Sequence, residues 1–479
     1  MNELQFEALL PFIVLAAASM AVILLIAFRM SHTVIQVASF FMACLVIFAM
    51  WYVKDTLPQT VPPLFVVDGF GALFTGMIIF SMMAVGLFSY IYFEEREENP
   101  KEYYILLFLA TLGAAVLTIS THFISLFIGL EVLSVSLYAL IAYLRNRNNA
   151  VESGMKYLVL AAVSSAFLLF GMALIYMETG SMEFERIALS IKASSSSVLF
   201  TMGFGIMLVA IGFKLALVPF HLWAADVYQG APSPVTAFIA TVSKIGVFAV
   251  LLRFALSVNL QQYPLMISIF SVIAMASMIV GNLLALRQQN IKRLMGYSSI
   301  AHFGYLLVAF LPGNAAGVEA ASFYLLAYSI TLLAVFGVIS VLSTRMKDAE
   351  DLVVYRGLFY KQPVLTAVLT ICFLSLAGIP LTAGFIAKFF ILASGVQQNL
   401  WLPVLVLVIT SVIGLYYYLR VISTLFGASS PAGSTAKPLY SFFYISTYIA
   451  LVVMMLLLCW LGIFPGSAVD GIRQFLLIR

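Results

Sequence analysis

The chain has 479 residues, of which 63% are hydrophobic and only 9% are charged. A mean hydropathy of +1.10 excludes a set of ordinary water-soluble domains. The formal net charge of +4 is small and spread along the chain, which argues against a nucleic-acid-binding surface. The composition therefore predicts an all-α polytopic membrane protein.

Apolar stretches long enough to cross a bilayer as a helix recur along the whole chain and predict about 14 spans. Their centres fall, in chain order, near Ala18, Met42, Ser81, Thr111, Val132, Ser164, Met207, Thr241, Ala274, Gly304, Thr331, Ser375, Thr410 and Ile449. The largest polar segments between them, 94–99, 178–197 and 429–438, are too short to form a domain. We therefore expect a single transmembrane domain over residues 1–479.

Basic residues between the spans predict the orientation of the chain. They gather in alternate loops, such as those that contain Arg145, Arg147, Lys292 and Arg293, and are sparse in the others. An even number of spans puts both termini on the same side. Because basic loops stay on the cytoplasmic side, both termini are expected on the outer side. The start of the chain is acidic, unlike a cleavable signal peptide, so the first span is expected to remain.

Two of the predicted spans contain a proline, in LALVPFH (215–221) and in LAGIPLTAG (376–384). Proline removes a backbone donor and interrupts a helix. Paired broken helices are typical of transporters built from two inverted repeats, with a site at mid-membrane. Gly129 and Tyr138 have the same spacing as Gly296 and Tyr305, which agrees weakly with a duplication.

Charged residues also lie at the centres of predicted spans: Glu131, Lys214, Lys244 and Lys388. A charge costs several kcal/mol at that depth and usually marks a transport path. The alternative for Glu131 is a structural carboxylate held by backbone or hydroxyl donors such as Ser134, and for Lys214 it is a lysine whose amine extends to the membrane surface. Burial disfavours charged lysine and a nearby carboxylate favours it, so a change in the Glu131–Lys214 distance could move a proton.

Lys156 and two histidines are further candidates. Lys156 follows Glu152 by four residues, so a local ion pair is as reasonable as a transport role. Histidine suits proton relays. His221 would share a face with Lys214 on a continuous helix, although Pro219 makes that geometry uncertain, and His302 could instead be a packed residue with a satisfied hydrogen bond.

No segment matches a nucleotide-binding, zinc-protease or hydrolase signature. Cys44, Cys372 and Cys459 lie in apolar runs without the spacing of a disulfide framework or a metal site. We therefore expect neither a metal nor a cofactor on this chain.

Three segments carry a resemblance to a known family: FKLALVPFHLWAADVYQGAPSPVTAF (213–238), GNLLALRQQNIKRLMGYSSIAHFGYLLVA (281–309) and LSLAGIPLTAGFIAKF (374–389). Over essentially its whole length the chain resembles the subunit N family of bacterial NADH:quinone oxidoreductase (respiratory complex I, NDH-1), whose members are antiporter-like. The resemblance implies two inverted five-helix repeats, at about 102–256 and 264–427, with flanking helices at both ends.

The resemblance also implies roles for individual residues. Glu131 and Lys214 look like the coupled pair of the family, Lys244 like its central connecting lysine, and Lys388 like the lysine of its second broken helix. Subunit M carries glutamate in place of Lys388, and subunit L continues into a lateral helix for which this chain has too few residues. Both relatives usually read Asp-Ala-His at 226–228, where this chain reads Asp-Val-Tyr.

The implied function is proton translocation driven by electron transfer from NADH to a quinone such as ubiquinone in other subunits. The family places FMN, the iron-sulfur clusters and the quinone pocket in those subunits, so this chain alone should catalyse no redox reaction. Expected partners are subunits M and K, the lateral helix of subunit L and the lipid of a bacterial plasma (inner) membrane, without nucleic acid. An Mrp-type cation/proton antiporter subunit, a non-conducting structural anchor and a relative fed by another reductant stay open.

Overall fold

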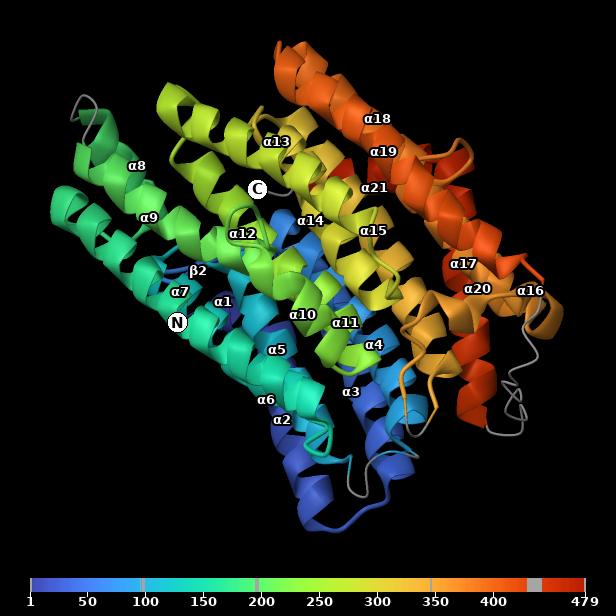
Figure 1. Ribbon diagram of the computed structural model, residues 1–479. Helices are drawn as coiled ribbons and strands as arrows, with labels where there is room; N and C mark the ends of the chain where they lie inside the picture. The colour runs from blue at the N-terminus through green and yellow to red at the C-terminus, as the bar shows by residue number, and fades with distance from the viewer. Residues whose placement is uncertain are drawn as a thin grey trace.

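The computed structural model describes residues 2–94, 96, 100–193, 198–344, 347–428 and 442–477, and within these it is almost entirely helical (Figure 1). The polar segment 429–438 lies outside the described residues, as do parts of 94–99 and 178–197. The predicted class, an all-α polytopic membrane protein, is confirmed.

Most of the long helices run side by side along one direction (Figure 1). They are α2 (Leu10–Ala27), α3 (His32–Tyr52), α4 (Gly69–Phe93), α5 (Glu102–Ile119), α6 (Phe123–Ile141), α7 (Asn148–Thr179), α9 (Val198–Leu215), α12 (Lys244–Ser257), α13 (Pro264–Ala285), α14 (Ile291–Phe310), α15 (Ala315–Leu342), α17 (Pro363–Ala377), α18 (Ala383–Gln397), α19 (Trp401–Leu425) and α20 (Phe442–Ile463). The shorter helices are α1 (Glu3–Ala8), α8 (Phe184–Ala193), α10 (Leu222–Gly230), α11 (Ser233–Phe238), α16 (Leu358–Lys361) and α21 (Gly466–Leu477). Single turns are η1 (Lys54–Thr56), η2 (Ile239–Ser243), η3 (Leu260–Gln262) and η4 (Leu352–Tyr355), and β1 (Gln59–Val61) pairs antiparallel with β2 (Phe65–Val67).

By length and composition, 12 helices in the described part of the chain can cross a membrane. The polar helix α14 and the broken pair α17 and α18 occupy the two remaining predicted positions, which gives the predicted total of about 14 spans. Both predicted breaks are present, between α9 and α10 and between α17 and α18.

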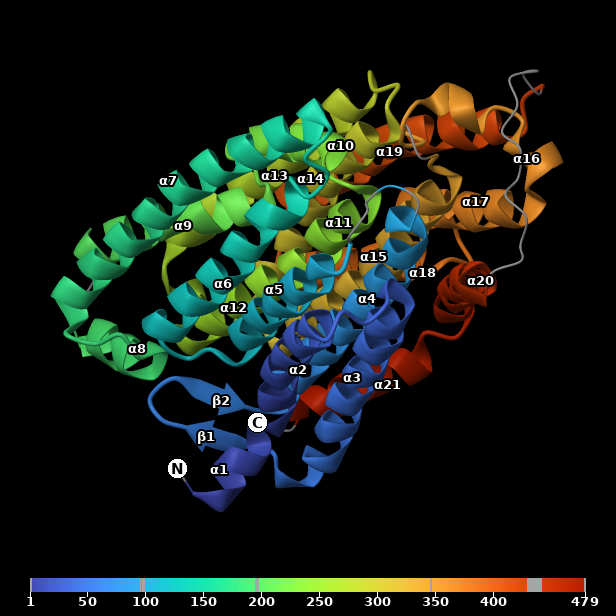
Figure 2. The ribbon, with the colours of Figure 1, turned by 90° about the horizontal axis from the view of Figure 1, so that it is seen from below.

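The connections at one end of the bundle gather around a cleft of about 590 Å³. Its lining includes Thr60 of the hairpin, Thr121, Glu183, Asn259 and Asn314. We call this end the N-terminal face, because α1 packs against β1 there. Figure 2 shows α1, the hairpin, α8 and α21 in its lower half, away from α10 and α16. Since α5 ends beside Thr121 at this face and α13 begins just after Asn259 at the same face, the two helices run in opposite directions.

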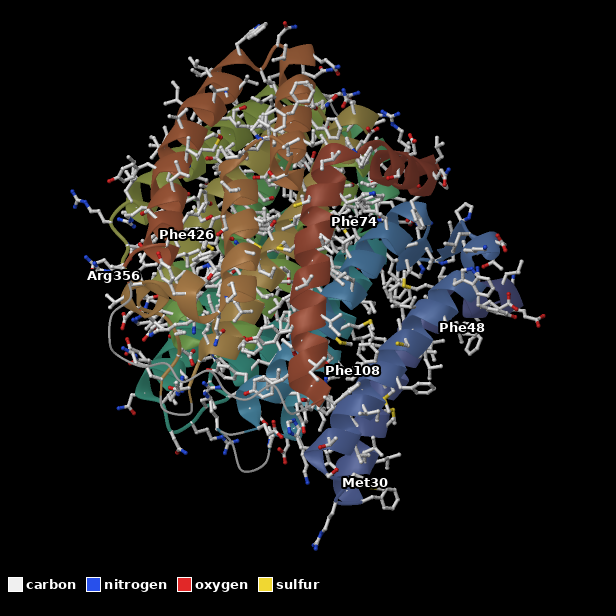
Figure 3. The ribbon with its side chains drawn as sticks, turned by 90° about the vertical axis from the view of Figure 1, so that its right-hand side faces the viewer. Met30, Phe48, Phe74, Phe108, Arg356 and Phe426 are labelled. Carbon is white, nitrogen blue, oxygen red and sulfur yellow. The ribbon has the colours of Figure 1, made fainter. Side chains whose placement is uncertain are left out.

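The outer surface of the bundle is apolar. Figure 3 marks Phe48 on α3, where its side chain is exposed, whereas Phe74 and Phe108 are fully buried. Helix α20 passes along the same side of the molecule, packed against α15, α17 and α18 (Figure 3). This pattern of exposed apolar side chains fits contact with lipid or other membrane subunits.

Two helix pairs cross in the same way. A Cβ placed on Gly113 of α5 would lie 2.5 Å from the backbone nitrogen of Leu133 on α6. A Cβ on Gly281 of α13 would lie 2.6 Å from the backbone nitrogen of Ala301 on α14. The same number of residues separates the two members of each contact. Glycine is what allows both pairs of backbones to approach so closely.

The atoms that lie second-nearest to each added Cβ fix the register between the two crossings. They are the carbonyl oxygens of Gly129, at 2.8 Å, and of Tyr297, at 2.9 Å. Gly129 therefore corresponds to Tyr297, and the correspondence with Gly296 suggested by the sequence is wrong by one residue. In the same register Glu131 corresponds to Ser299.

The packing of the other helices follows the same scheme. In the first set α5 packs against α6 and α12, and α7 against α9 and α10; in the second α13 packs against α14 and α19, and α15 against α17 and α18. We therefore propose that residues of about 102–256 and 264–427 are two structural repeats of opposite orientation.

Replacing Gly113 with alanine should destabilise the chain by about 1–3 kcal/mol, because the added methyl group displaces the backbone of α6. The midpoint of thermal unfolding of the detergent-solubilised protein measures the change. Gly205 of α9 provides the control, because a Cβ there meets nothing within 4 Å. A Gly113→Ala protein as stable as Gly205→Ala would contradict the close crossing.

Many hydroxyl groups inside the bundle are satisfied by their own helix. Ser81, Thr111, Ser322 and Ser340 each donate a hydrogen bond of 2.7–2.8 Å to the carbonyl four residues earlier. Such bonds remove the cost of a hydroxyl in an apolar environment without any partner on another helix. Hydroxyls that bond to another helix are therefore the ones to consider as parts of a functional site.

Candidate functional site

Lys214 lies in the last turn of α9, just before the first break, and is buried. Its Nζ donates a 2.5 Å hydrogen bond to Oγ of Ser134 on α6 and lies 5.5 Å from the ring centroid of Tyr157. The carbonyl of Phe213, the residue before Lys214, accepts a 2.9 Å hydrogen bond from Nε1 of Trp223 on α10. The C-terminal end of a helix carries partial negative charge, which favours an ammonium group there.

Glu131 is half-buried on α6, one turn before Ser134. Its Oε1 accepts a 2.5 Å hydrogen bond from Oγ of Ser165 on α7. The ion pairs among the described residues do not join Glu131 to Lys214. The structure thus places the two predicted partners on different helices, with Glu131 one turn before the serine that binds Lys214, and each is held by a serine rather than by an ion pair with the other.

Lys156 has a different setting, on α7 near the face opposite the N-terminal face. Its side chain is 46% exposed, and Nζ lies 2.7 Å from Glu152 and 3.2 Å from Asp226. Arg293 also pairs with Asp226, at 2.7 Å. The local ion pair considered from the sequence is present, with a second carboxylate from α10 added.

His221 lies within the first break, directly before α10. The chain turns at Ala216, whose φ is +59°, so Lys214 and His221 do not lie on one continuous helix. His221 is buried, and its Nδ1 has no hydrogen-bond partner among the described residues. The structure does not bring His221 into hydrogen-bond contact with the lysines.

Lys244 is the first residue of α12 and follows the π-helical turn η2. One wider turn shifts the faces of a helix, and such turns are frequent at functional sites. The Lys244 Nζ donates a 2.6 Å hydrogen bond to Oγ of Ser299 on α14 and lies 4.4 Å from the ring centroid of Phe303. The lysine is fully enclosed by protein.

Ser299 is also bonded to two tyrosines. The hydroxyl of Tyr328 on α15 lies 2.6 Å from Ser299 Oγ, and that of Tyr228 on α10 lies 3.3 Å from it. Together with Lys244, this makes three polar partners from three different helices. All four residues are buried.

His302 lies one turn after Ser298 on α14, where it is buried. Its Nε2 lies 3.0 Å from the hydroxyl of Tyr418, which also bonds Ser298, and its Nδ1 lies 2.6 Å from the hydroxyl of Tyr324. Both ring nitrogens are therefore satisfied by phenols.

Lys388 lies on α18, after the second break. Its Nζ donates to the carbonyl oxygens of Leu376, at 2.9 Å, and Ala377, at 3.1 Å, the last two residues of α17. Gly378 ends α17 with a φ of +82°, and a Cβ there would approach Lys388 Cδ to 3.0 Å. The interrupted helix α17 thus offers its last two carbonyls to the ammonium group of Lys388.

A small cavity of about 10 Å³, close to the size that holds one water, connects Lys388 to the tyrosines. Its lining includes Lys388, Ser375, His302, Tyr324 and Tyr328. Lys244 and Lys388 are therefore separated by Ser299, Tyr328 and this cavity.

A buried ionic cluster lies at the face opposite the N-terminal face, beside a cavity of about 310 Å³. Asp348 is paired with Arg147, at 2.9 Å, and with Lys292, at 3.0 Å, and accepts a hydrogen bond of 2.6 Å from Tyr92. Lys292 Nζ also donates to the carbonyl of Ala231, at 2.6 Å. Lys292, which the sequence placed among the loop charges, is fully buried.

The described residues contain no group of three or more His, Cys, Asp or Glu side chains that could hold a metal ion. The three cysteines are free. The amines, hydroxyls and one carboxylate of this arrangement can exchange protons with one another.

A bundle of membrane-spanning helices with two breaks and buried lysines beside them defines an antiporter-like membrane subunit. Residues 120–414 match the family described as "NADH:quinone oxidoreductase/Mrp antiporter, TM". The chain belongs to this family.

Solved structures agree with this assignment. A chain of respiratory complex I from Thermus thermophilus is 32% identical, with a TM-score of 0.83 over 96% of this chain and 98% of that chain. A chain of an archaeal respiratory membrane complex, the membrane-bound sulfane sulfur reductase, is 25% identical, with a TM-score of 0.86 over 98% and 96%. A chain of the Mrp complex from Dietzia sp. DQ12-45-1b, at 20% identity and a TM-score of 0.84 over 98% and 97%, shares the fold.

Proposed function

We propose that this chain is a proton-translocating membrane subunit, of the subunit N type, in an NADH:quinone oxidoreductase. The observation that carries the proposal is the bonding of its buried lysines. Lys214, Lys244 and Lys388 bond to neutral oxygens, and the ion pairs among the described residues include none of them. A buried amine without a counter-ion can change its protonation state, whereas a paired one is held charged.

The choice of complex rests on similarity. The 32% identity to a chain of Thermus thermophilus complex I extends over nearly all of both chains. Lysine at position 388, where the resemblance gives subunit M a glutamate, supports the subunit N type. The lower identity to the Mrp chain, 20%, makes the cation/proton antiporter the second candidate.

The same proposal implies the neighbouring subunits, the cofactors of the complex and the membrane. Subunits M and K and the lateral helix of subunit L are the proposed neighbours, and FMN, the iron-sulfur clusters, NADH and quinone bind elsewhere in the complex. The chain would lie in a bacterial inner membrane with both termini outside. Basic side chains such as Arg147, Lys292 and Arg293 gather at the face opposite the N-terminal face, and this supports the orientation.

Purification of the tagged chain from its native membrane in a mild detergent tests the proposal. Mass spectrometry of the preparation should find a flavin-bearing peripheral arm, and the preparation should oxidise NADH in the presence of quinone. An untagged membrane taken through the same steps is the control. Recovery with small antiporter subunits and without NADH oxidation would instead support the Mrp-type function.

A further inference from the structure

We propose that Ser299 and Tyr328 form a hydroxyl relay that carries a proton between Lys244 and the cavity of Lys388. The proposal rests on the proposed function and names side chains for one segment of its proton path. Neither residue stands out in the sequence, because serine and tyrosine are common in the apolar spans of this chain.

Ser299 is hydrogen-bonded to three polar side chains at once. A serine hydroxyl has one proton to donate and two lone pairs to accept with. Lys244 Nζ, the Tyr328 hydroxyl and the Tyr228 hydroxyl surround its Oγ at 2.6, 2.6 and 3.3 Å, so the three partners use its full capacity. When Lys244 is charged it donates to Ser299, and at least one tyrosine must then accept the serine proton. When Lys244 is neutral, Ser299 can donate to the amine instead.

Tyr328 continues the path. It bonds Ser299 and also lines the cavity that contains Lys388. Tyr228 bonds the same serine but is not part of that lining. His302 lines the cavity, yet its nitrogens are bonded to Tyr324 and Tyr418 rather than to Ser299. Tyr328 is thus the side chain whose contacts reach both the serine of Lys244 and the cavity of Lys388.

The correspondence between the two helix crossings gives independent support. Ser299 occupies on α14 the position that Glu131 occupies on α6, since Tyr297 corresponds to Gly129. Glu131 is bonded across to α7 by Ser165, and Ser299 is bonded across to α15 by Tyr328. The second half therefore has a neutral hydroxyl pair where the first half has a carboxylate and a hydroxyl.

The proton balance of the step is simple. Protonated Lys244 gives a proton to Ser299 Oγ while the serine proton passes to the Tyr328 oxygen. The phenolic proton passes to a water in the cavity, and that water gives a proton to the neutral amine of Lys388. Each hydroxyl gains one proton and loses one, so the net change is a neutral Lys244 and a charged Lys388. Transfer in the opposite direction uses the same bonds in reverse.

The test compares Tyr328→Phe with Tyr228→Phe in the purified complex reconstituted into liposomes. Both variants remove one hydroxyl from Ser299 and keep the ring. We expect Tyr328→Phe to lower NADH-driven proton uptake, followed with a pH-sensitive dye, by at least about tenfold, a conservative figure for a positioned proton-transfer group. Tyr228→Phe should lower proton uptake clearly less than Tyr328→Phe does, because Tyr228 bonds Ser299 without lining the cavity of Lys388. Mass spectrometry of the assembled complex verifies that each variant is incorporated.

The other results separate the relay from the function on which it rests. If both tyrosine variants pump normally while Lys244→Met does not, the relay is wrong and the proposed function stands. Equal losses in both tyrosine variants would also overturn the relay, because they would show a packing role around Ser299. Normal pumping by Lys244→Met would overturn the proposed function itself.

Ser299→Thr and Ser299→Ala provide a second comparison on the other relay residue. Threonine keeps the hydroxyl and adds a methyl group, whereas alanine removes the hydroxyl. We expect NADH-driven proton uptake to be higher in the Ser299→Thr complex than in the Ser299→Ala complex. Equal pumping by the two variants would contradict the relay.

Discussion

Replacing Lys214 with methionine should abolish proton translocation by this chain while leaving it folded and assembled. Methionine keeps the apolar stem of the side chain and removes the ammonium group, whose hydrogen bond in the structure is to Ser134. Since the ion pairs among the described residues do not include Lys214, and the nearby Glu131 carboxylate is held by Ser165, the change breaks no buried ion pair and should not destabilise the chain. We expect proton uptake and NADH-dependent quinone reduction to fall together, because coupled steps stall together.

The measurement is the initial rate of each reaction in liposomes that contain the assembled complex, and the expected loss is at least about tenfold. Lys347→Met is the matched control, because Lys347 is exposed and paired with Asp351 in a loop. Unchanged rates in both Lys214→Met and Lys388→Met would identify the chain as a structural anchor that conducts no protons.

Replacing Asp348 with asparagine should cause the largest loss of stability. Asp348 neutralises Lys292, which is fully buried, and Arg147, and it joins α4, α14 and the turn before α7. Removing one partner of a buried ion pair leaves an uncompensated charge and costs about 3–5 kcal/mol. The midpoint of thermal unfolding in detergent, and the amount of chain in the membrane, should both fall clearly. Lys292→Met added to Asp348→Asn should recover part of the loss.

Asp351→Asn is the control for this experiment, because Asp351 is half-exposed and its ion pair is within one loop. Acid should act in the same direction as Asp348→Asn. Burial by itself raises the pKa of Asp348, but Lys292 and Arg147 outweigh it and hold this pKa well below its usual range. The stabilisation is therefore complete above the ordinary carboxyl pKa and is lost as the pH falls through the lowered one. Equal stability of the Asp348→Asn and Asp351→Asn proteins would contradict this account.

The sequence was sufficient for the features that depend on one segment at a time. Apolar length located the spans, and Pro219 and Pro380 located the two breaks, because proline acts on its own helix. Lys214, Lys244 and Lys388 were identified because a lysine in an apolar span is rare enough to stand out.

The partners of these lysines could not be read from the sequence. Ser134 and Ser299 resemble many other hydroxyl residues in the spans, and only helix packing decides which of them face a lysine. Lys292 was taken for a loop charge because it lies at the start of α14, whereas the adjoining loop folds back and buries it under Asp348. The sequence paired Glu131 with Lys214 but could not give the distance between them, because spacing along the chain does not determine the distance between two helices.

The hydroxyls that bond their own helices have a consequence for how tightly the chain can hold a proton gradient. Because Ser81, Thr111, Ser322 and Ser340 direct their protons along the axis of their own helices, they offer no step to a neighbouring helix. A proton on the path proposed for Lys244 and Lys388 would therefore find no relay at these four side chains. Under the proposed function, such hydroxyls would help to keep the bundle around the path insulating and to limit the return leak of protons.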